Sequence, residues 1–222
     1  MVELAGERVL AILTRAPSAA GKTRLFADLG VPPDPRLLSA LLLDTIDGTA
    51  ASGVPIVVAV TPAAACDEVR ALLLESQAPD AEVIAQPDGG LGERMRATMA
   101  ALFARGAAAV ALIGSDLPHI GAAPIGAAFA ALADEPALVI LGPAGDGGYY
   151  LIAATRVPDV FDAIEWGTPQ VLEQTRGLAA DRGIPIRLAA TLDDVDSAAD
   201  LRRAAAGGLA PRTAAWIRAA LH

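Results

Sequence analysis

The sequence predicts an α/β protein built on a mainly parallel, doubly wound sheet with helices on both faces. Short apolar runs of strand length recur along the chain, and most of them alternate with longer segments of helical character. This alternation is typical of parallel sheets whose crossover connections are helices. Polar and glycine-rich motifs follow several of the predicted strands, where ligands bind in sheets of this kind.

The first half of the chain alternates between strand and helix. Residues 9–13, 55–60 and 81–85 are short apolar runs, a pattern that indicates buried strands. A segment of helical length follows each run, and glycine or proline marks several of the helix ends. The predicted helices of this half span residues 35–51, 64–75 and 91–105.

The second half continues the pattern. Its predicted strands span residues 107–113, 137–141, 149–153 and 186–190. An Asp-Gly pair between the second and third of these runs is a hairpin signal. The predicted helices are 122–133, 169–181 and 197–205, and a final helix at 211–221 follows the glycine- and proline-containing break at 207–211.

Length and charge restrict the possible functions. The 222 residues suit a single domain, residues 1–222, on which we expect the C-terminal helix of segment 206–222 to pack through Trp216. A net charge of −9 disfavours nucleic acid as a partner, and no apolar stretch is long enough for a membrane span. The lone Cys66 excludes an internal disulfide, so a cytoplasmic protein is expected.

The single lysine of the chain, Lys22, follows the first predicted strand in a loop of small residues. Backbone N–H groups and cations at such a position suit a polyphosphate, although a lone lysine can also be merely solvated. We expect Lys22 and Arg24 to be catalytic cations. The nucleotide-binding residues predicted here are Thr14, Arg15, Ala16, Gly21, Lys22 and Thr23.

Carboxylates far apart in the sequence are candidate metal ligands. Asp116 ends an apolar strand, and Asp194 and Asp196 face the same side if their segment is extended. Mg²⁺ in proteins is bound by one or two carboxylates together with phosphate oxygens. We therefore expect Asp116, Asp194 and Asp196 to hold a metal, with Asp116 also catalytic. The alternatives are a strand-end turn at Asp116 and a helix-cap neighbour at Asp196.

Two further glycine-rich loops are candidates for substrate binding. The loop at 86–95 lies between a strand and a helix, and we expect it to bind the nucleotide through Gly90, Gly92, Glu93 and Arg94. The loop at 142–150 allows close approach of a ligand, besides forming a hairpin turn. Thr168 is expected at a helix N-cap. The predicted acceptor-binding or sugar-binding residues are Asp146, Gly147, Gly148, Tyr149, Trp166 and Thr168.

Together these motifs resemble a glycosyltransferase-A-like (GT-A) bacterial family that is related to phospholactate guanylyltransferases. The resemblance spans nearly the whole chain and includes Gly21-Lys-Thr-Arg-Leu25, Leu91-Gly-Glu-Arg-Met95, Ile113-Gly-Ser-Asp-Leu-Pro118, Trp166-Gly-Thr-Pro169 and Asp194-Val-Asp196. It implies a GT-A fold, a nucleotide held by the first loop, and Mg²⁺ or Mn²⁺ between Asp116 and a late aspartate. The sequence at 146–150 departs from the Gly-Thr-Asn-type acceptor loop of the related guanylyltransferases.

The sequence thus predicts a metal-dependent transferase that uses a nucleoside triphosphate or a nucleotide-sugar and a small acceptor. Nucleotidyl transfer is favoured, because Lys22 and Arg24 could stabilise the charge on departing pyrophosphate. Glycosyl transfer is the first alternative. The second is a P-loop-like NTPase or kinase, since 16–23 resembles a phosphate-binding loop, or a noncatalytic nucleotide-binding protein.

Overall fold

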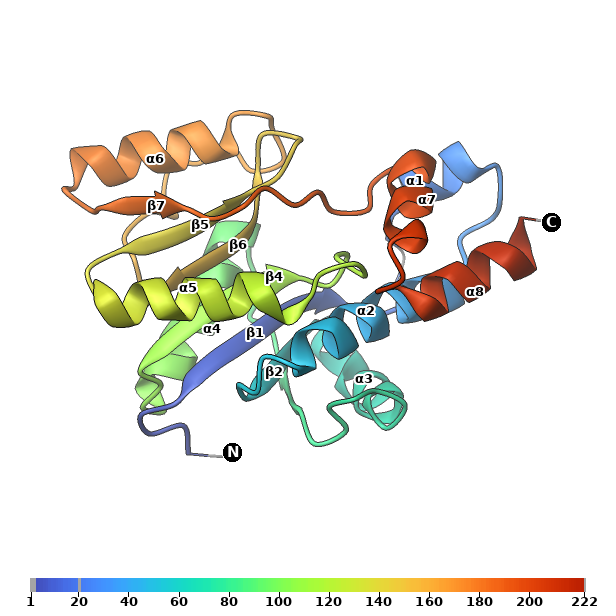
Figure 1. Cartoon of the computed structure of the whole chain (residues 1–222), viewed down its shortest axis with the longest axis horizontal. Helices are drawn as coiled ribbons and strands as arrows, with labels where there is room; N and C mark the ends of the chain where they lie inside the picture. Colours follow the sequence, from blue (N-terminus) through green and yellow to red (C-terminus); the bar gives the residue numbers. More distant parts are fainter. Residues whose placement is uncertain (1–2, 20, 222) are drawn as a thin grey trace.

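A computed structural model describes residues 3–19 and 21–221, and within them seven strands form one sheet in the order β3-β2-β1-β4-β6-β5-β7 (Figure 1). Neighbouring strands are parallel except that β6 runs antiparallel to both β4 and β5. The mainly parallel sheet predicted from the sequence is therefore confirmed. The strands are β1 (Arg8–Arg15), β2 (Ile56–Thr61), β3 (Glu82–Ala85), β4 (Ala109–Gly114), β5 (Val139–Pro143), β6 (Tyr149–Ala154) and β7 (Ile186–Leu188).

Helices cover both faces of this sheet. Side chains of α2, α3 and α5 form one buried cluster with residues of one sheet face, and side chains of α4 and α6 form another with residues of the opposite face. The central strands are nearly continuous apolar runs because both of their faces are covered. The helices are α1 (Thr23–Leu29), α2 (Pro35–Ala50), α3 (Cys66–Leu73), α4 (Leu91–Ala104), α5 (Ala122–Asp134), α6 (Val171–Asp181), α7 (Ala198–Ala206) and α8 (Pro211–Ala220).

A third apolar cluster joins α1, α2, α7 and α8 beside the sheet (Figure 1). The fully buried carboxylate of Asp44 in α2 fixes the start of α8, because it accepts hydrogen bonds from the backbone N–H groups of Arg212 and Thr213 at 3.2 and 2.8 Å. Asp34, the N-cap of α2, accepts a hydrogen bond from Trp216 Nε1 at 2.8 Å. These contacts anchor the C-terminal helices to α2.

Several local features differ from the sequence predictions. The short helix α1 was not predicted, and the predicted helix at 64–75 is divided between a 3₁₀ turn, Ala63–Ala65, and α3. The N-cap of α6 is Gln170 and not Thr168. The Thr168 hydroxyl instead donates a hydrogen bond to Glu165 O at 2.8 Å, so it closes the preceding turn. No helix in the described part of the chain is long and apolar enough to cross a membrane.

Candidate active site

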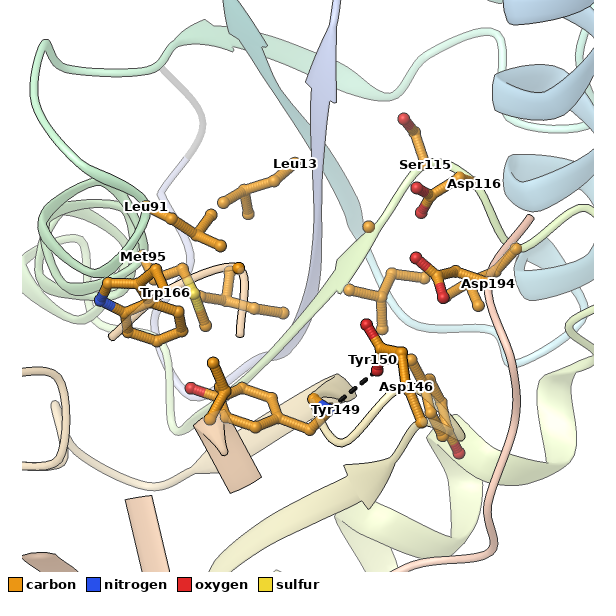
Figure 2. A pocket seen from close by; sticks show the side chains of 18 of the residues that line it. Leu13, Leu91, Met95, Ser115, Asp116, Asp146, Tyr149, Tyr150, Trp166 and Asp194 are labelled. Atoms are coloured by element: carbon orange, nitrogen blue, oxygen red, sulfur yellow. Dashed lines mark hydrogen bonds between the residues drawn. The ribbon is translucent and has the colours of Figure 1, made fainter. Parts of the chain in front are cut away.

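The loops that follow β1, β4 and β5 meet at one edge of the sheet, because these three strands run in the same direction. Together with the start of α4 and the segment before α6, they surround a cavity of about 450 Å³ (Figure 2). Its volume lies in the usual range for small-molecule sites. Most of the chemically interesting side chains singled out in the sequence lie in or beside this cavity.

Asp116 is held at the end of β4 by a buried threonine of α2. Thr45 Oγ1 accepts a hydrogen bond from Leu117 N at 3.2 Å and lies 3.1 Å from Ser115 O. The Thr45 side chain is fully buried. Since buried polar contacts of this kind restrict a loop strongly, the backbone on either side of Asp116 is fixed to α2.

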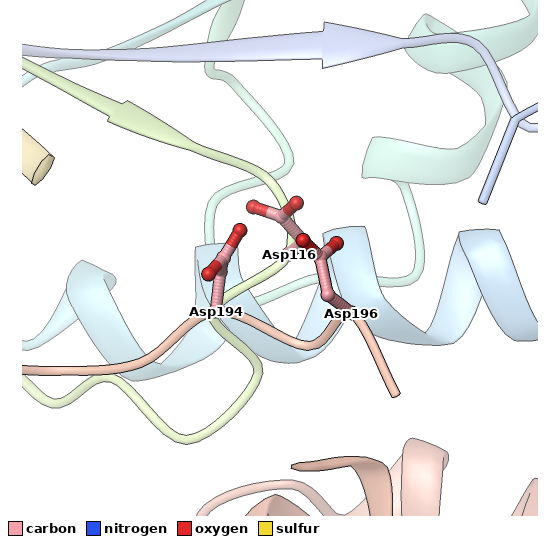
Figure 3. A group of neighbouring side chains, drawn as sticks. All are labelled: Asp116, Asp194 and Asp196. Carbon is pink, nitrogen blue, oxygen red and sulfur yellow. The ribbon is translucent and has the colours of Figure 1, made fainter. Parts of the chain in front are cut away.

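A backbone hydrogen bond brings the late acidic segment to the same place. Val195 N donates to Asp116 O at 3.0 Å, and the fully buried Val195 side chain belongs to the cluster of α1, α2, α7 and α8. Asp194 and Asp196 therefore lie on either side of this anchor. Figure 3 shows the three carboxylates turned toward one another, and one oxygen of each lies within 4.8 Å of the others.

The segment after Asp196 is fixed by two helix-start interactions. Ala198 N donates a hydrogen bond to Asp28 Oδ2 of α1 at 2.7 Å. Ser197 and Asp200 form a reciprocal capping box at the start of α7. The acidic segment is thus tied both to the β4 loop and to α1.

Lys22 joins the acidic cluster from the other side. It is the N-cap of α1 and has a left-handed backbone with φ of 50°. Its Nζ atom lies 2.6 Å from Asp116 Oδ2 and 2.5 Å from Asp196 Oδ1. Burial alone would lower the pKa of Lys22, but Asp116 and then Asp196 outweigh that effect and raise it above the ordinary value. Lys22 is therefore charged throughout the neutral range.

The charged form of Asp194 is disfavoured by its surroundings in the cluster. Burial, followed by the nearby carboxylates of Asp116 and Asp196, raises the pKa of Asp194 to about 7, and Lys22 only partly offsets this. Three carboxylates and one ammonium leave the cluster with an excess of negative charge. Oxygen donors in this arrangement fit a hard divalent cation such as Mg²⁺ or Mn²⁺.

Of the residues predicted in the first loop, the structure brings Arg15, Gly21 and Lys22 to the cavity wall. Thr14 and Ala16 are buried at the end of β1 and do not line the cavity. Two others, Thr23 and Arg24, lie on α1 with exposed side chains, outside the cavity lining. The structure thus groups Lys22, but not Arg24, with Asp116.

The predicted residues of the second glycine-rich loop border the cavity without lining it. Glu93 Oε2 accepts a hydrogen bond from Gly90 N at 2.7 Å and so caps α4. Arg94 Nη1 donates to Gln86 Oε1 at 3.3 Å, and the Gln86 amide in turn donates to the ends of β1 and β2. Gly92 is buried beneath Trp166.

Most of the residues predicted to bind an acceptor line the cavity, namely Asp146, Gly148, Tyr149, Trp166 and Thr168. Gly147, with φ of 89°, lies behind them against Pro169, where a Cβ atom would come within 2.0 Å of the Pro169 carbonyl oxygen. Its own carbonyl accepts a hydrogen bond from Leu172 N at 2.9 Å. This contact ties the acceptor loop to the start of α6.

The apolar part of the site was not predicted from the sequence. The residues concerned are spread over three strands and one helix, and each had the pattern of an ordinary core residue. Only the fold brings them to one cavity wall. They are Leu13, Leu91, Met95, Leu112 and Ile152.

Comparison with known proteins identifies relatives over nearly the whole chain. Residues 45–168 match the family described as "Uncharacterized protein conserved in bacteria (DUF2064)". A phosphoenolpyruvate guanylyltransferase of Geodermatophilus obscurus is 32% identical over 224 residues, which cover 98% of this chain and 96% of the relative.

Solved structures show the same fold. A protein of Desulfovibrio desulfuricans described as a nucleotide-diphospho-sugar transferase superposes with a TM-score of 0.79 and 27% identity, covering 96% of this chain and 97% of its own. The manganese complex of Rv0371c from Mycobacterium tuberculosis superposes with a TM-score of 0.50 and 19% identity, covering 90% and 98% of the two chains. The predicted GT-A-type fold is confirmed, and it excludes the P-loop fold suggested by residues 16–23.

Proposed function

Since this chain belongs to the DUF2064 family and is a GT-A-type transferase related to guanylyltransferases, we propose that it transfers a guanylyl group from GTP to a small acceptor. The guanylyltransferase relative, similar over the full length, supports guanine as the base. The observation that carries the proposal is the meeting of Lys22 with Asp116, Asp194 and Asp196 beside one cavity, which the first three of these residues line.

A divalent cation is proposed as the cofactor. The carboxylates of Asp116, Asp194 and Asp196 would hold Mg²⁺ or Mn²⁺, and their close oxygen atoms and excess negative charge fit such an ion. A protein of this fold has been crystallised with manganese, which supports the choice. When bound, the ion would neutralise charge on the phosphates of the nucleotide.

The residues of the chain would act mainly by charge and position. The acceptor oxygen forms a bond to the α-phosphorus, the bond from that phosphorus to the bridging oxygen breaks, and pyrophosphate leaves with the electron pair. Lys22, and Arg15 at the same end of the cavity, would stabilise the negative charge that grows on the leaving group. A proton on the acceptor oxygen would pass to Asp146, the acidic residue of the acceptor loop.

We propose that Arg24 also acts on the triphosphate. Its side chain is exposed on the first turn of α1, two residues after Lys22, where it would contact a triphosphate that extends out of the cavity. The remaining predicted nucleotide residues do not line the cavity, and we propose that they support its walls from outside; they are Thr14, Ala16, Thr23, Gly90, Gly92, Glu93 and Arg94.

Glycosyl transfer from a nucleotide-sugar is the alternative, supported by the solved structure described as a nucleotide-diphospho-sugar transferase. The two reactions release different products. Nucleotidyl transfer releases pyrophosphate from a triphosphate, whereas glycosyl transfer releases a nucleoside diphosphate from a nucleotide-sugar.

A product assay tests the proposal. The purified protein would be incubated with Mg²⁺, a panel of small acceptors, and either one of the four nucleoside triphosphates or a GDP-sugar. We expect pyrophosphate from GTP, and loss of its release in Asp116→Asn. Asp134→Asn, an exposed carboxylate at the end of α5, is the matched control and should keep the activity. Release of GDP from a GDP-sugar, without pyrophosphate from any triphosphate, would refute nucleotidyl transfer.

A further inference from the structure

The cavity has two chemically different halves, which Figure 2 separates clearly. Asp116, Asp146 and Asp194 lie on one side. Apolar and aromatic side chains lie on the other, among them Leu91, Met95 and Trp166. The acidic half accounts for the metal and the phosphates of the proposed function. The apolar half is bordered by Tyr149 and Trp166, two of the residues predicted to bind the acceptor.

The side of the apolar half that the sheet provides is built from buried strand residues. Leu112 of β4 and Ile152 of β6 are direct partners across the antiparallel pair, and their side chains are 2% and 1% exposed. Leu13 of β1 lies on the same face of the sheet, and Met95 of α4 covers it from above. These residues pack like those of a protein core, but they leave a cavity between them.

Two aromatic rings close the apolar half. Tyr149 and Trp166 meet edge to face with ring centroids 6.2 Å apart, a favourable arrangement for aromatic pairs. Burial raises the pKa of Tyr149, an effect that Thr175 only partly offsets, so the phenol remains neutral. The Trp166 ring lies directly over Gly92, where a Cβ atom would come within 2.7 Å of the indole nitrogen.

The charges along the cavity are distributed unevenly. Among the described residues of its lining, the cations are Arg15 and Lys22. Arg15 is the last residue of β1, and Lys22 lies in the loop that follows this strand. The acceptor loop contributes a carboxylate, Asp146, and no cation. An acceptor with several negative charges would face that carboxylate without a counter-charge, and burying an unpaired charge is costly.

We propose, on the basis of the proposed function, that the acceptor is an uncharged hydroxyl compound with an apolar body, which sits between Trp166, Tyr149, Leu91 and Met95. Its hydroxyl oxygen forms the bond to the α-phosphorus of the nucleotide while pyrophosphate leaves, and its proton passes to Asp146. This acceptor class differs from phosphoenolpyruvate, the phosphorylated acid in the name of the guanylyltransferase relative.

Ligand-observed NMR tests this acceptor class directly. The probe is 2-phenylethanol, an apolar ring that carries one hydroxyl, and the comparison compound is phosphoenolpyruvate, both in the presence of GTP and Mg²⁺. We expect 2-phenylethanol to bind at least about tenfold more tightly, a difference of about 1.4 kcal/mol. Equal or tighter binding of phosphoenolpyruvate would overturn the proposal.

Substitutions of cavity residues test where 2-phenylethanol binds. Trp166→Leu and Leu91→Asp should each weaken 2-phenylethanol binding at least about tenfold and leave the affinity for GTP within about twofold. Leu91 is 40% exposed at the first position of α4, where an acidic residue is well tolerated. Leu209→Asp is the matched control, because Leu209 is 50% exposed and lies outside the cavity lining. It should leave both affinities unchanged.

The outcomes separate this proposal from the proposed function. If Trp166→Leu removes GTP binding together with the probe, the apolar half holds the base of the nucleotide, and the acceptor assignment is wrong. If the probe binds as expected but the product assay releases GDP from a GDP-sugar, the apolar acceptor site stands and guanylyl transfer is wrong. The far-UV circular dichroism spectrum and the melting temperature without ligand show in each variant whether the fold is intact.

Discussion

The ammonium group of Lys22 lies 2.6 Å from the carboxylate of Asp116, although the two residues come from loops after different strands. β1 and β4 are parallel neighbours in the sheet, so their ends meet at the same edge. The contact brings a cation suited to phosphate together with a carboxylate suited to a metal. In the absence of both ligands, the ammonium itself neutralises part of the acidic cluster.

Replacing Lys22 by Met should change the two ligands in opposite directions. The nucleotide-free protein should bind Mn²⁺ about fivefold more tightly, because the competing ammonium is removed from Asp116 and Asp196. GTP should bind at least about tenfold more weakly, since a hydrogen bond to a charged group contributes about 1.5–3 kcal/mol. Calorimetric titration with each ligand measures both effects.

Arg202→Met is the control for this prediction. Arg202 is an exposed cation of α7 that does not line the cavity, so its loss changes the net charge equally without touching the site. Unchanged Mn²⁺ affinity in Lys22→Met, or an equal change in both variants, would show that Lys22 does not compete with the metal.

Asp194→Asn should weaken the metal site and stabilise the metal-free fold. The variant keeps the shape of the side chain but removes one of three neighbouring carboxylates. We expect the Kd for Mn²⁺ to rise at least about tenfold, and the free energy of unfolding without metal to rise by about 1 kcal/mol as repulsion decreases. Urea unfolding with and without Mn²⁺ checks both. A less stable metal-free variant would contradict the repulsion argument.

Gly92→Ala should disturb the aromatic wall of the cavity. An alanine inside a helix usually stabilises it by about 0.5–1 kcal/mol relative to glycine, but here the new methyl group would collide with Trp166. We expect no gain in stability and a red shift of tryptophan fluorescence as the ring moves into water. Gly126→Ala in α5, where a Cβ atom meets nothing within 4 Å, should show the ordinary gain and no shift.

Asp34→Ala should reduce stability in a pH-dependent manner. The hydrogen bond from Arg36 is the main cause that lowers the pKa of Asp34 to about 2; burial opposes it, and Trp216 adds to the lowering. Since the folded state favours the charged form, the stabilisation is present above the ordinary pKa of 3.8 and is lost as the pH falls toward 2.

The expected cost of Asp34→Ala at neutral pH is about 1–2 kcal/mol, the usual loss for a helix cap. Urea unfolding at pH 7 and at pH 3 should show the difference from the unsubstituted protein shrinking in acid. Asp67→Ala, whose side chain is 94% exposed, is the control and should be nearly neutral at both values. A cost that grows in acid would contradict the assignment.

The sheet could be predicted because its strands are continuous apolar runs of the right length, such as residues 9–13 in β1. Helix α1 could not, because it has only seven residues and is soon followed by Gly30 and the prolines of the next loop. Its stability comes from Leu25 and Phe26, which are buried against α2, α7 and α8. Such tertiary support leaves no periodic signal in a short segment.

The polar part of the candidate site was predictable for a similar reason. Asp116 and Lys22 follow strands, and the ends of parallel strands gather at one edge of a sheet. The apolar half was not predictable, because Leu13 and Met95 look like ordinary core residues, and only the packing of α4 on the sheet leaves space between them. Thr168 shows the opposite error, since a residue with good capping chemistry closes a turn instead.

The most direct test is a crystal structure with MnCl₂ and a GTP analogue that carries a methylene group between the α- and β-phosphates. We expect an anomalous peak for a manganese ion that is bound by the carboxylates of Asp116, Asp194 and Asp196, with Lys22 turned from these carboxylates toward the phosphates. Manganese bound elsewhere, or a phosphate chain that contacts neither the ion nor Lys22, would contradict this expectation.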